Sequence, residues 1–213
     1  MKIAVIGASG FVGAKVVDEA LRRGHRVTAI VQHPEKLPRH AALTAVKADA
    51  YDAAALAKVL VGHDAVISAF NPGWGKPDIQ VLFVKGTQAI IAATRQAGIR
   101  RLLVVGGAGS LYVAPGVQLV DTLEFPPQFK QGALGAREAL NILQKEKGLD
   151  WTLLSPAILL QPGQRTGKFR IGADAPLMAA DGPGRISVED LAVALLDETE
   201  TPHHIGKRFT VAY

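Results

Sequence analysis

The sequence predicts an α/β fold: a Rossmann-like, doubly wound parallel sheet with a small C-terminal cap segment. Two observations carry this prediction. Short apolar runs alternate with helical segments along most of the chain, as successive parallel β-α-β units require. The first of these units carries three glycines, Gly7, Gly10 and Gly13, between an apolar run and an amphipathic stretch. In a sheet of this class the ligand crevice lies at the carboxyl ends of the strands.

The expected strands are short apolar runs with many β-branched residues, as strands covered on both faces should be. After the first run, which ends at Ile6, they lie at residues 26–31, 43–48, 65–69, 102–105 and 151–154. A last run at residues 208–213 predicts one more strand.

Apolar residues at helical spacing predict the helices. One helix follows the glycine motif directly, and others are expected at residues 53–60, 79–97 and 132–147. Gly24, Gly98 and Gly148 stand just after three of these segments, where a left-handed glycine commonly closes a helix. Ser187 and Asp190 resemble a capping box and predict the start of the last helix.

Residues 155–186 are expected to form a substrate cap over the crevice. This stretch is rich in proline and glycine and is too long for a plain connection. It is expected to contain short strands, such as one at residues 168–171. The whole chain, residues 1–213 with the cap included, is expected to be a single Rossmann-like domain, because its length suits one core.

Composition excludes several classes of function. The chain has no cysteine, which excludes disulfides, thiolate metal sites and a cysteine nucleophile. The net charge is +5, but the basic residues are scattered, so no nucleic-acid partner is expected. There is no long uncharged apolar run and no signal peptide is recognised, so we expect no membrane partner and a cytoplasmic location. No metal is expected, because His203 and His204 lack partners at ligand spacing.

The strongest functional signal is the stretch Gly-Ala-Ser-Gly-Phe-Val-Gly at residues 7–13. The first glycine permits a tight turn, the second lets a pyrophosphate approach the backbone, and the third lets the helix lie close to the strand. Free N–H groups at the helix N-terminus would hold the phosphates. The dinucleotide is therefore expected to contact Gly7, Ser9, Gly10, Phe11, Val12 and Gly13. The alternative is a glycine-rich turn that binds no ligand.

The end of the second strand bears on the choice between NAD and NADP. Folds that prefer NAD usually place an acidic residue about twenty positions after the glycine motif, and residues 28–33 contain none. A 2′-phosphate would be tolerated there, which favours NADP weakly, although the segment could be an ordinary solvated loop. The candidate contacts are Gln32, His33 and Lys36 on this loop, and Asp49 and Ala50 after the third strand. Asp49 could instead cap the helix that begins near residue 52.

Small residues follow three further strands and would leave room for the nicotinamide half of the cofactor. The candidate contacts are Ser68, Ala69 and Phe70 after the fourth strand, Gly106, Gly107 and Ala108 after the fifth, and Ser155, Pro156 and Ala157 after the sixth. The last three residues could instead simply end their strand. Ser110 carries the one hydroxyl group of the segment that follows the fifth strand. It is the candidate catalytic residue, and its alternative role is that of a turn residue.

With these motifs the chain resembles the atypical short-chain dehydrogenase/reductases, through residues 7–13 and Val-Val-Gly-Gly-Ala-Gly-Ser-Leu at 104–111. Segments 151–157, 162–168 and 185–190 resemble more specifically the NADH-flavin reductase group, which is related to biliverdin reductase B and to NmrA-like proteins. The resemblance runs nearly end to end. It implies a Rossmann-like domain that binds NAD(P)H, with a flavin or quinone as acceptor. Gln32 stands where such proteins often carry an arginine for the 2′-phosphate.

The chain lacks the Tyr-x-x-x-Lys pair with which the larger reductase superfamily transfers a proton. None of Tyr51, Tyr112 and Tyr213 has a lysine four residues later. Hydride transfer to FMN or FAD survives this loss, because solvent can protonate the reduced ring. The candidate apolar wall for such an acceptor consists of Leu111, Leu123, Phe125, Phe129 and Ile158, each of which could instead be plain core.

The sequence therefore predicts an NAD(P)H-dependent reductase, a monomer or homodimer, that passes hydride to a flavin or a similar planar acceptor. Two alternatives stay open. One is a quinone reductase, and the other is a non-catalytic, NAD(P)-sensing regulatory protein of the NmrA type. An isomerase is disfavoured by the missing Tyr-x-x-x-Lys pair.

Overall fold

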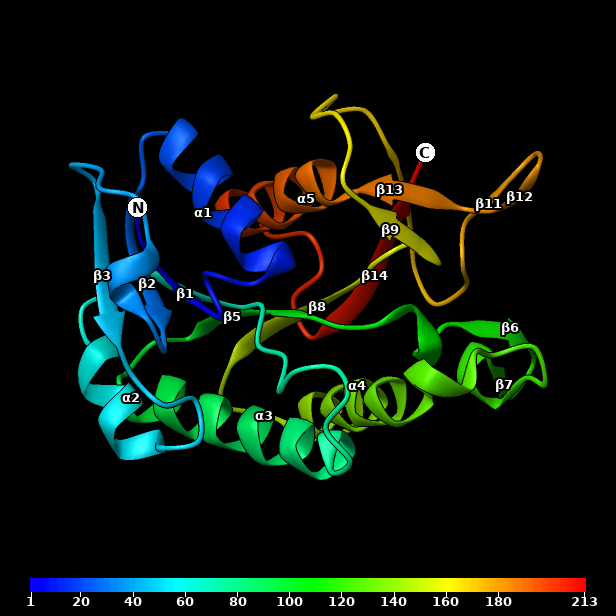
Figure 1. Cartoon of the computed structure of the whole chain (residues 1–213), viewed down its shortest axis with the longest axis horizontal. Helices are drawn as coiled ribbons and strands as arrows, with labels where there is room; N and C mark the ends of the chain where they lie inside the picture. Colours follow the sequence, from blue (N-terminus) through cyan, green and yellow to red (C-terminus); the bar gives the residue numbers. More distant parts are fainter.

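A computed structural model describes all 213 residues and shows a central eight-stranded sheet between two layers of helices (Figure 1). The strand order is β3-β2-β1-β4-β5-β8-β14-β10. The strands are β1 (Lys2–Ile6), β2 (Arg26–Val31), β3 (Leu43–Lys47), β4 (Ala65–Ser68), β5 (Arg101–Val105), β8 (Asp150–Ser155), β14 (Lys207–Ala212) and β10 (Arg170–Gly172). Every neighbouring pair is parallel except β10 with β14. The predicted Rossmann-like α/β fold is confirmed, and each predicted main-sheet strand outside the cap lies within one residue of its expected bounds.

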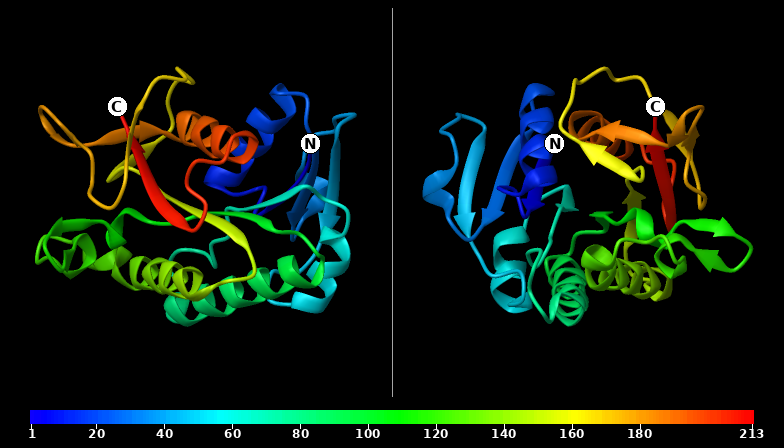
Figure 2. Two further views of the ribbon diagram at one scale, coloured as in Figure 1. Left: turned by 180° about the vertical axis from the view of Figure 1, so that it is seen from behind. Right: turned by 45° about the vertical axis from the view of Figure 1, so that its right-hand side comes forward.

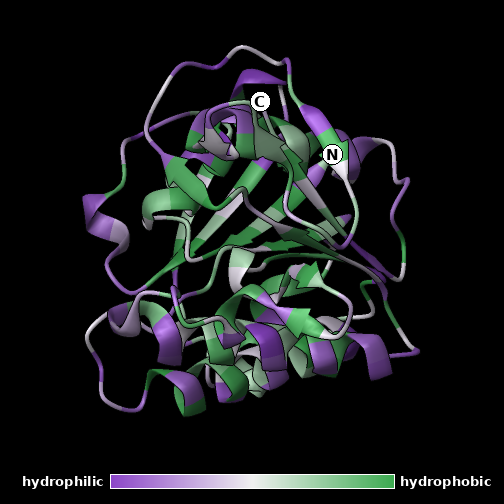
Figure 3. Ribbon diagram, turned by 90° about the vertical axis from the view of Figure 1, so that its right-hand side faces the viewer, coloured by the Kyte–Doolittle hydropathy of each residue, from purple (hydrophilic) through white to green (hydrophobic).

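Helices cover both faces of this sheet (Figures 1 and 2). On one face lie α1 (Phe11–Arg22) and α5 (Val188–Glu200), and on the other lie α2 (Ala53–Leu60), α3 (Ile79–Gln96) and α4 (Pro127–Lys145). Successive strand residues point to opposite faces, so Leu154 packs in the core under α1 and α5 while Leu153 packs in the core of the other face. Hydrophobic residues gather along the strands between the two layers (Figure 3).

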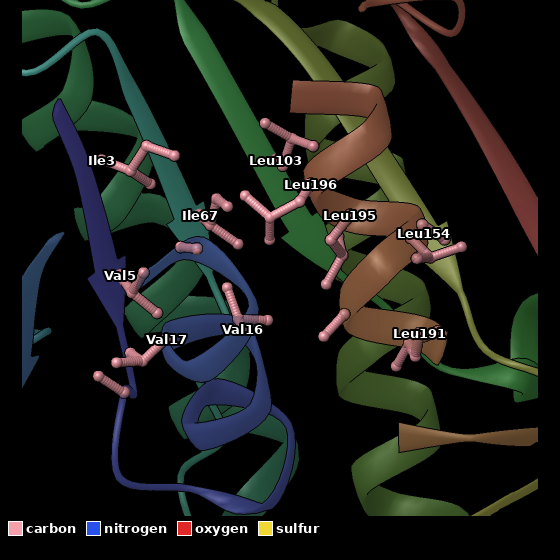
Figure 4. Close-up of a cluster of buried hydrophobic side chains, with 14 of the residues drawn as sticks. Ile3, Val5, Val16, Val17, Ile67, Leu103, Leu154, Leu191, Leu195 and Leu196 are labelled. Atoms are coloured by element: carbon pink, nitrogen blue, oxygen red, sulfur yellow. The ribbon is translucent and has the colours of Figure 1, made fainter. Parts of the chain in front are cut away.

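The core beneath α1 and α5 joins side chains from both ends of the sequence. Val16 on α1 and Leu195 on α5 are fully buried against strand residues such as Val5 (Figure 4). The glycine-rich start of the chain and its last helix therefore share one hydrophobic core. Burial of this apolar surface holds α1 in place against the sheet.

Two helix starts are capped by a side chain. Asp52 precedes α2 and accepts a hydrogen bond from the Ala55 N–H at 2.9 Å. Ser187 precedes α5 and accepts one from the Asp190 N–H at 3.0 Å. Each side chain satisfies an N–H group that the first helical turn leaves free. The predicted capping role of Ser187 is confirmed.

Two predictions about α4 are wrong. The helix begins at Pro127, five residues before the predicted start, because a proline fits the first turn, where its missing N–H costs nothing. It ends at Lys145, and Glu146 already has extended backbone. Gly148 therefore does not close the helix and has no positive φ, unlike Gly24 and Gly98, whose φ values of +79° and +73° confirm their predicted role.

Residues 155–186, drawn from yellow to orange, flank the carboxyl edge of the sheet on the α1 and α5 side (Figures 1 and 2). They contain β9 (Leu159–Gln161), which pairs with β13 (Arg185–Ser187), and a hairpin of β11 (Met178–Ala179) and β12 (Gly182–Pro183). The strand predicted at residues 168–171 is found as β10, which begins two residues later and ends one residue later. Because β10 pairs with β14, part of the expected cap belongs to the main sheet.

The turn at residues 163–167 is fastened to α1 and α5 by three acidic side chains. Arg165 donates to both carboxylate oxygens of Glu19 at 2.7 and 2.8 Å. The Gly163 N–H donates to Glu189 at 2.9 Å, and the Thr166 N–H donates to the fully buried Asp190 at 2.8 Å. Segments 162–168 and 185–190, both of which carried the family resemblance, thus contact each other. We call this set of contacts the acidic clamp.

Several short elements were not predicted. They are the 3-10 turns η1 (Pro34–Lys36), η2 (Ala108–Ser110) and η3 (Leu119–Asp121), and the hairpin of β6 (Tyr112–Ala114) and β7 (Val117–Gln118). The β6–β7 hairpin lies on the α4 side of the carboxyl edge, opposite residues 155–186 (Figure 1). The edge is therefore bordered on both sides by segments that follow parallel strands.

Candidate functional site

Gly7 and Gly13 let β1, β4 and α1 approach one another closely. Gly7 has a φ of +75°, and a Cβ atom there would lie 2.6 Å from the Ala69 carbonyl oxygen. A Cβ atom on Gly13 would overlap the Gly7 carbonyl oxygen. Both glycines are therefore required by the packing of the turn itself, and neither tolerates a side chain.

Gly10 differs from its two partners. It precedes α1 with a φ of −77°, which any residue can adopt, and a Cβ atom there would meet only the Gly7 carbonyl oxygen, at 3.2 Å. No side chain caps the helix, and its first turn contains no acidic residue. The N–H groups of the first turn, on Phe11, Val12 and Gly13, therefore have no intrahelical partner and favour an anion. This arrangement fits a dinucleotide pyrophosphate.

The turn lies where the strand order reverses. β1 pairs with β2 on one side and with β4 on the other, which is the position of the ligand crevice in open α/β sheets. Ser68, at the end of β4, is 3% exposed, and the Ala69 N–H donates to the Ile6 carbonyl oxygen at 2.9 Å. The Phe70 ring packs on the bare backbone of Gly86. The residues after β1 and β4 therefore lie at one point of the edge.

The predicted adenosine contacts lie on exposed loops beside this turn. Gln32 donates to the Ala48 carbonyl oxygen at 3.4 Å, and His33 Nδ1 lies 3.2 Å from a carboxylate oxygen of Glu35. Lys36 ends the η1 turn. Glu35 was not considered from the sequence, because the expected acid belongs on the strand end and not on a turn beyond it. It places a negative charge beside the predicted 2′-phosphate contacts.

Asp49 and Ala50 follow β3 as predicted. The Asp49 carboxylate accepts a hydrogen bond from the Tyr51 N–H at 2.9 Å, whereas Asp52 caps α2. The alternative that Asp49 caps the helix is therefore wrong. Tyr51 packs edge-to-face on Phe70, with 5.6 Å between ring centroids, which links the loop after β3 to the loop after β4.

Small residues form a shelf at the end of β5, which we define as residues 106–110. A Cβ atom on Gly109 would lie 2.9 Å from Ala133 of α4, so that glycine is needed for close packing. A Cβ atom on Gly107 would lie 3.4 Å from Ala136, an ordinary contact. Gly106 packs against Leu153 of β8. Gly107 is thus the shelf glycine that packing does not require.

Ser110 closes the shelf and is 2% exposed. Its hydroxyl group donates to the Gly107 carbonyl oxygen at 3.4 Å and accepts from Arg208 Nη1 at 3.1 Å. Arg208 is itself buried and donates through its other nitrogens to Asp174, at 2.6 and 2.9 Å. Sequence reasoning missed Arg208, because it lies on β14 and no local pattern connects it with the shelf. The catalytic role of Ser110 stays a prediction.

The two α4 side chains that pack against the shelf glycines are alanines and carry no proton-transferring group. Ala133 packs against Gly109 and Ala136 against Gly107. A Tyr-x-x-x-Lys pair occupies two positions four residues apart. At this end of α4, the pair of positions that includes Ala133 begins at Phe129, so it holds an aromatic ring and a methyl group. A Tyr–Lys pair is therefore absent from this helix face in space as well as from the sequence.

The residues predicted for the acceptor wall are not all brought together. Leu111 is fully buried and Leu123 is fully exposed, so these two do not share a wall. Phe125 lies close to Gly109, and Phe129 is 46% exposed at the start of α4. Ile158 is half-buried after β8. Trp74, which was not predicted, packs edge-to-face on Phe129 with 5.5 Å between ring centroids.

Ser155 ends β8 beside the shelf and is completely buried, yet its hydroxyl group has no hydrogen-bond partner within the protein. Ala157 belongs to the core under α1 and α5, and Pro156 between them is also buried. A buried hydroxyl group without a partner is costly unless a ligand or water supplies one. Ser155 therefore suits a polar group of a bound molecule at this end of the edge.

No group of three or more histidine, cysteine, aspartate or glutamate side chains is placed to hold a metal ion. None of the helices combines the length and the apolar character needed to cross a membrane.

A Rossmann-like sheet with an uncapped glycine turn at its switch point defines a dinucleotide-binding protein. A family model described as NAD(P)H-binding matches residues 7–202, and the chain belongs to that family. A curated relative, the uncharacterized protein YwnB of Bacillus subtilis, is 41% identical over 214 residues, which cover 99% of this chain and 98% of the relative.

Solved structures of similar proteins have the same fold. The structure of a candidate epimerase from Bacteroides thetaiotaomicron superposes on this chain with a TM-score of 0.92 and 44% sequence identity, covering 100% of this chain and 96% of that chain. A candidate NADH-flavin reductase from Streptococcus pneumoniae has a TM-score of 0.85 and 37% identity, with coverage of 100% and 99%. Cinnamoyl-CoA reductase 1 of Petunia hybrida is 26% identical over 237 residues, 96% of this chain and 71% of that protein. The protein is thus an NAD(P)-binding member of an oxidoreductase family, and the resemblance to atypical short-chain dehydrogenase/reductases is confirmed.

Proposed function

We propose that the protein is an NAD(P)H-dependent reductase that passes hydride to a flavin or a similar planar acceptor. The observation that supports this proposal is the surface of α4 beside the shelf, where Ala133 and Ala136, and no proton-transferring group, pack against Gly109 and Gly107. A carbonyl acceptor needs a proton at the developing alkoxide. A flavin does not, since its reduced ring delocalises the charge and takes a proton from water.

Different residues at the carboxyl edge of the sheet would bind the cofactor and orient the acceptor. The first turn of α1 would hold the pyrophosphate, and NAD(P)H when bound supplies the hydride. A flat ring would lie over the backbone at Gly107, where no side chain projects, and the unpartnered hydroxyl group of Ser155 would orient a polar group there. Holding two rings in contact is the main contribution that such a site makes to the rate.

Lys36 supports a weak preference for NADPH within this proposal. Its ammonium group is exposed beside the end of β2, where a 2′-phosphate would lie. The neighbouring Glu35 opposes that preference, and His33 lies against Glu35. With one exposed cation and one exposed carboxylate, the discrimination between the two cofactors should be small.

The test is to measure initial rates of NADH and NADPH oxidation with riboflavin, FMN, FAD, a soluble quinone and an aromatic aldehyde. We expect turnover with the flavins and none with the aldehyde. Turnover with the quinone alone would reassign the acceptor. Faster reduction of the aldehyde than of any flavin would refute the proposal. Tight cofactor binding without turnover of any acceptor would do so too, and would favour a sensor.

A further inference from the structure

Trp74 projects from the loop between β4 and α3 and is 58% exposed. It stands between two glycines with positive φ, Gly73 at +108° and Gly75 at +87°, which L side chains rarely adopt. The Asn71 side chain accepts a hydrogen bond from the Gly73 N–H at 2.8 Å and stabilises the turn. The backbone is thus shaped to present an indole ring whose larger part lies outside the core.

The Trp74 ring rests on α4 at a position where that helix has no side chain. A Cβ atom on Gly132 would overlap Cζ3 of Trp74 and lie 2.9 Å from its Cη2 atom. The half-exposed Phe129 ring lies edge-to-face against Trp74, at an interplanar angle of 79°. We call Trp74 and Phe129 the aromatic pair.

The aromatic pair lies about one helical turn along α4 from the residues that contact the shelf. Ala136 of α4 lies against Gly107, and Gly132, on which Trp74 rests, is four residues earlier in the same helix. At 1.5 Å per residue the two positions are about 6 Å apart along the helix axis. Ala133, between them, lies against Gly109. A flat molecule placed at Gly107 would therefore need to extend only a few ångströms along α4 to reach the pair.

We propose that the aromatic pair is the outer part of the acceptor site and stacks on the ring system of a planar aromatic acceptor of the isoalloxazine type. This inference rests on the proposed function and names the residues that select the acceptor. Exposed aromatic rings favour flat, polarisable partners in stacked or edge-to-face contact. The pair is neither oxidised nor reduced. Hydride leaves the nicotinamide ring for the acceptor ring, and water supplies the proton.

Tryptophan fluorescence can test binding separately from turnover. The chain has two tryptophans, and the other one, Trp151, is 3% exposed in the core. Riboflavin is titrated in the presence of NADP⁺, so that no hydride can move. We expect riboflavin to quench the emission of the wild type. In Trp74→Phe the remaining emission comes from Trp151, and we expect riboflavin not to quench it.

Two substitutions refine the test. Gly132→Ala should displace the exposed ring at little cost to the fold, because alanine favours a helix more than glycine does. Gly132→Ala and Trp74→Ala should each raise the KM for riboflavin about tenfold, which is the effect expected when one ring contact is lost. The KM for NADPH should stay unchanged in both variants. Ile205→Ala, at an exposed apolar residue before β14 at the opposite edge, is the control and should change neither.

The outcomes separate the two proposals. Quenching that depends on Trp74 without any NADPH oxidation would refute the reductase function and leave the pair as a ring-binding site. Flavin turnover with the same riboflavin KM in Trp74→Ala would overturn the present inference and leave the reductase function standing. Trp74→Ala that converts a dimer into a monomer, with riboflavin binding unchanged, would show that the pair is a subunit contact and would also overturn it.

Discussion

The Nη1 atom of Arg208 donates to the backbone carbonyl oxygen of Ser110 at 2.7 Å and to the hydroxyl group of the same residue at 3.1 Å. The rest of the guanidinium group holds Asp174, whose own carbonyl oxygen accepts from the Tyr112 N–H at 2.8 Å. One buried cation therefore joins β14, the shelf and the segment that precedes β11. The shelf owes its position to a residue from the far end of the chain.

Arg208→Lys should lower the free energy of unfolding by about 2–4 kcal/mol. Lysine keeps the positive charge, but its single ammonium group cannot donate to Ser110 and Asp174 at the same time as the planar guanidinium group does. One of these buried oxygen acceptors therefore loses its hydrogen bond. Urea unfolding measures the effect. Asp174→Asn is the control at the exposed end of the contact and should cost about 1 kcal/mol or less. Equal stability of wild type and Arg208→Lys would show that the charge alone suffices.

Gly10→Val should abolish measurable cofactor binding while the protein stays folded. The φ of −77° suits valine, and a Cβ atom there meets only the Gly7 carbonyl oxygen, but the branched side chain would occupy the pyrophosphate position. Calorimetric titration with NADPH and NADH provides the measurement, and thermal unfolding shows that the variant is folded. Unchanged affinity in a folded variant would mean that the cofactor binds elsewhere.

The choice of cofactor should respond to the two charges after β2. Lys36→Ala should weaken NADPH binding by about 1 kcal/mol and leave NADH binding unchanged, because an exposed charge contact contributes little. Glu35→Gln should strengthen NADPH binding by a similar amount. Dissociation constants at low and at physiological salt test both. Tighter binding of NADH than NADPH by the wild type under both conditions would refute the proposed preference.

The shelf should matter for its space and not for its hydroxyl group. Gly107→Leu should remove most flavin turnover, since the side chain would project where the acceptor ring is proposed to lie, even if the adenosine end still binds. Ser110→Ala and Tyr112→Phe should each slow turnover by less than about tenfold, below the 10²–10⁴-fold typical of a lost general acid. Single-turnover oxidation of NADPH with excess flavin measures all three. A thousandfold loss in Ser110→Ala with intact cofactor affinity would indicate a carbonyl acceptor.

The acidic clamp should make stability depend on pH through Glu19. Burial alone would raise the pKa of Glu19, but hydrogen bonds from Arg165, Arg23 and Arg22 outweigh it and lower the pKa to about 2. A lowered folded-state pKa gives stability that is fully present above the ordinary value of 4.5 and is lost as the pH falls toward 2. At pH 7 the contribution is about 3 kcal/mol.

Glu19→Gln tests this dependence. Its free energy of unfolding should lie below that of the wild type at pH 7, and the gap should narrow between pH 4.5 and 2 as the wild-type carboxylate is protonated. Other carboxylates titrate in both proteins, so the difference isolates Glu19. A gap of constant size across this range would show that the carboxylate charge does not contribute.

The inner strands of the sheet could be predicted from the sequence because they are short apolar runs, the pattern that buried strands leave, whereas the edge strands β3 and β10 are largely exposed. The glycine motif could also be predicted from local sequence, because the spacing of its three glycines is typical of a tight turn between a strand and a helix. The start of α4 could not, because Pro126 and Pro127 look like a break although a proline suits a first turn.

The rest of the site depends on contacts between distant residues. Arg208 reaches Ser110 across ninety-eight positions of the chain. Trp74 contacts Gly132 only because α4 packs beside the loop that follows β4. The prediction for Leu123 rested on hydrophobicity alone, and the loop that carries it has no periodic pattern to say which way a side chain points.

The antiparallel edge strand β10 bears on how the chain acquires its structure during synthesis. β10 precedes β14 in the sequence, yet it joins the sheet only by pairing with β14, which itself pairs with β8. While the ribosome is still making α5, β10 has no strand to pair with and β8 has an open edge. Closure of that edge waits until residues 207–212 have left the exit tunnel, so a nascent chain paused before that point would carry a bare strand that invites pairing with a neighbouring chain.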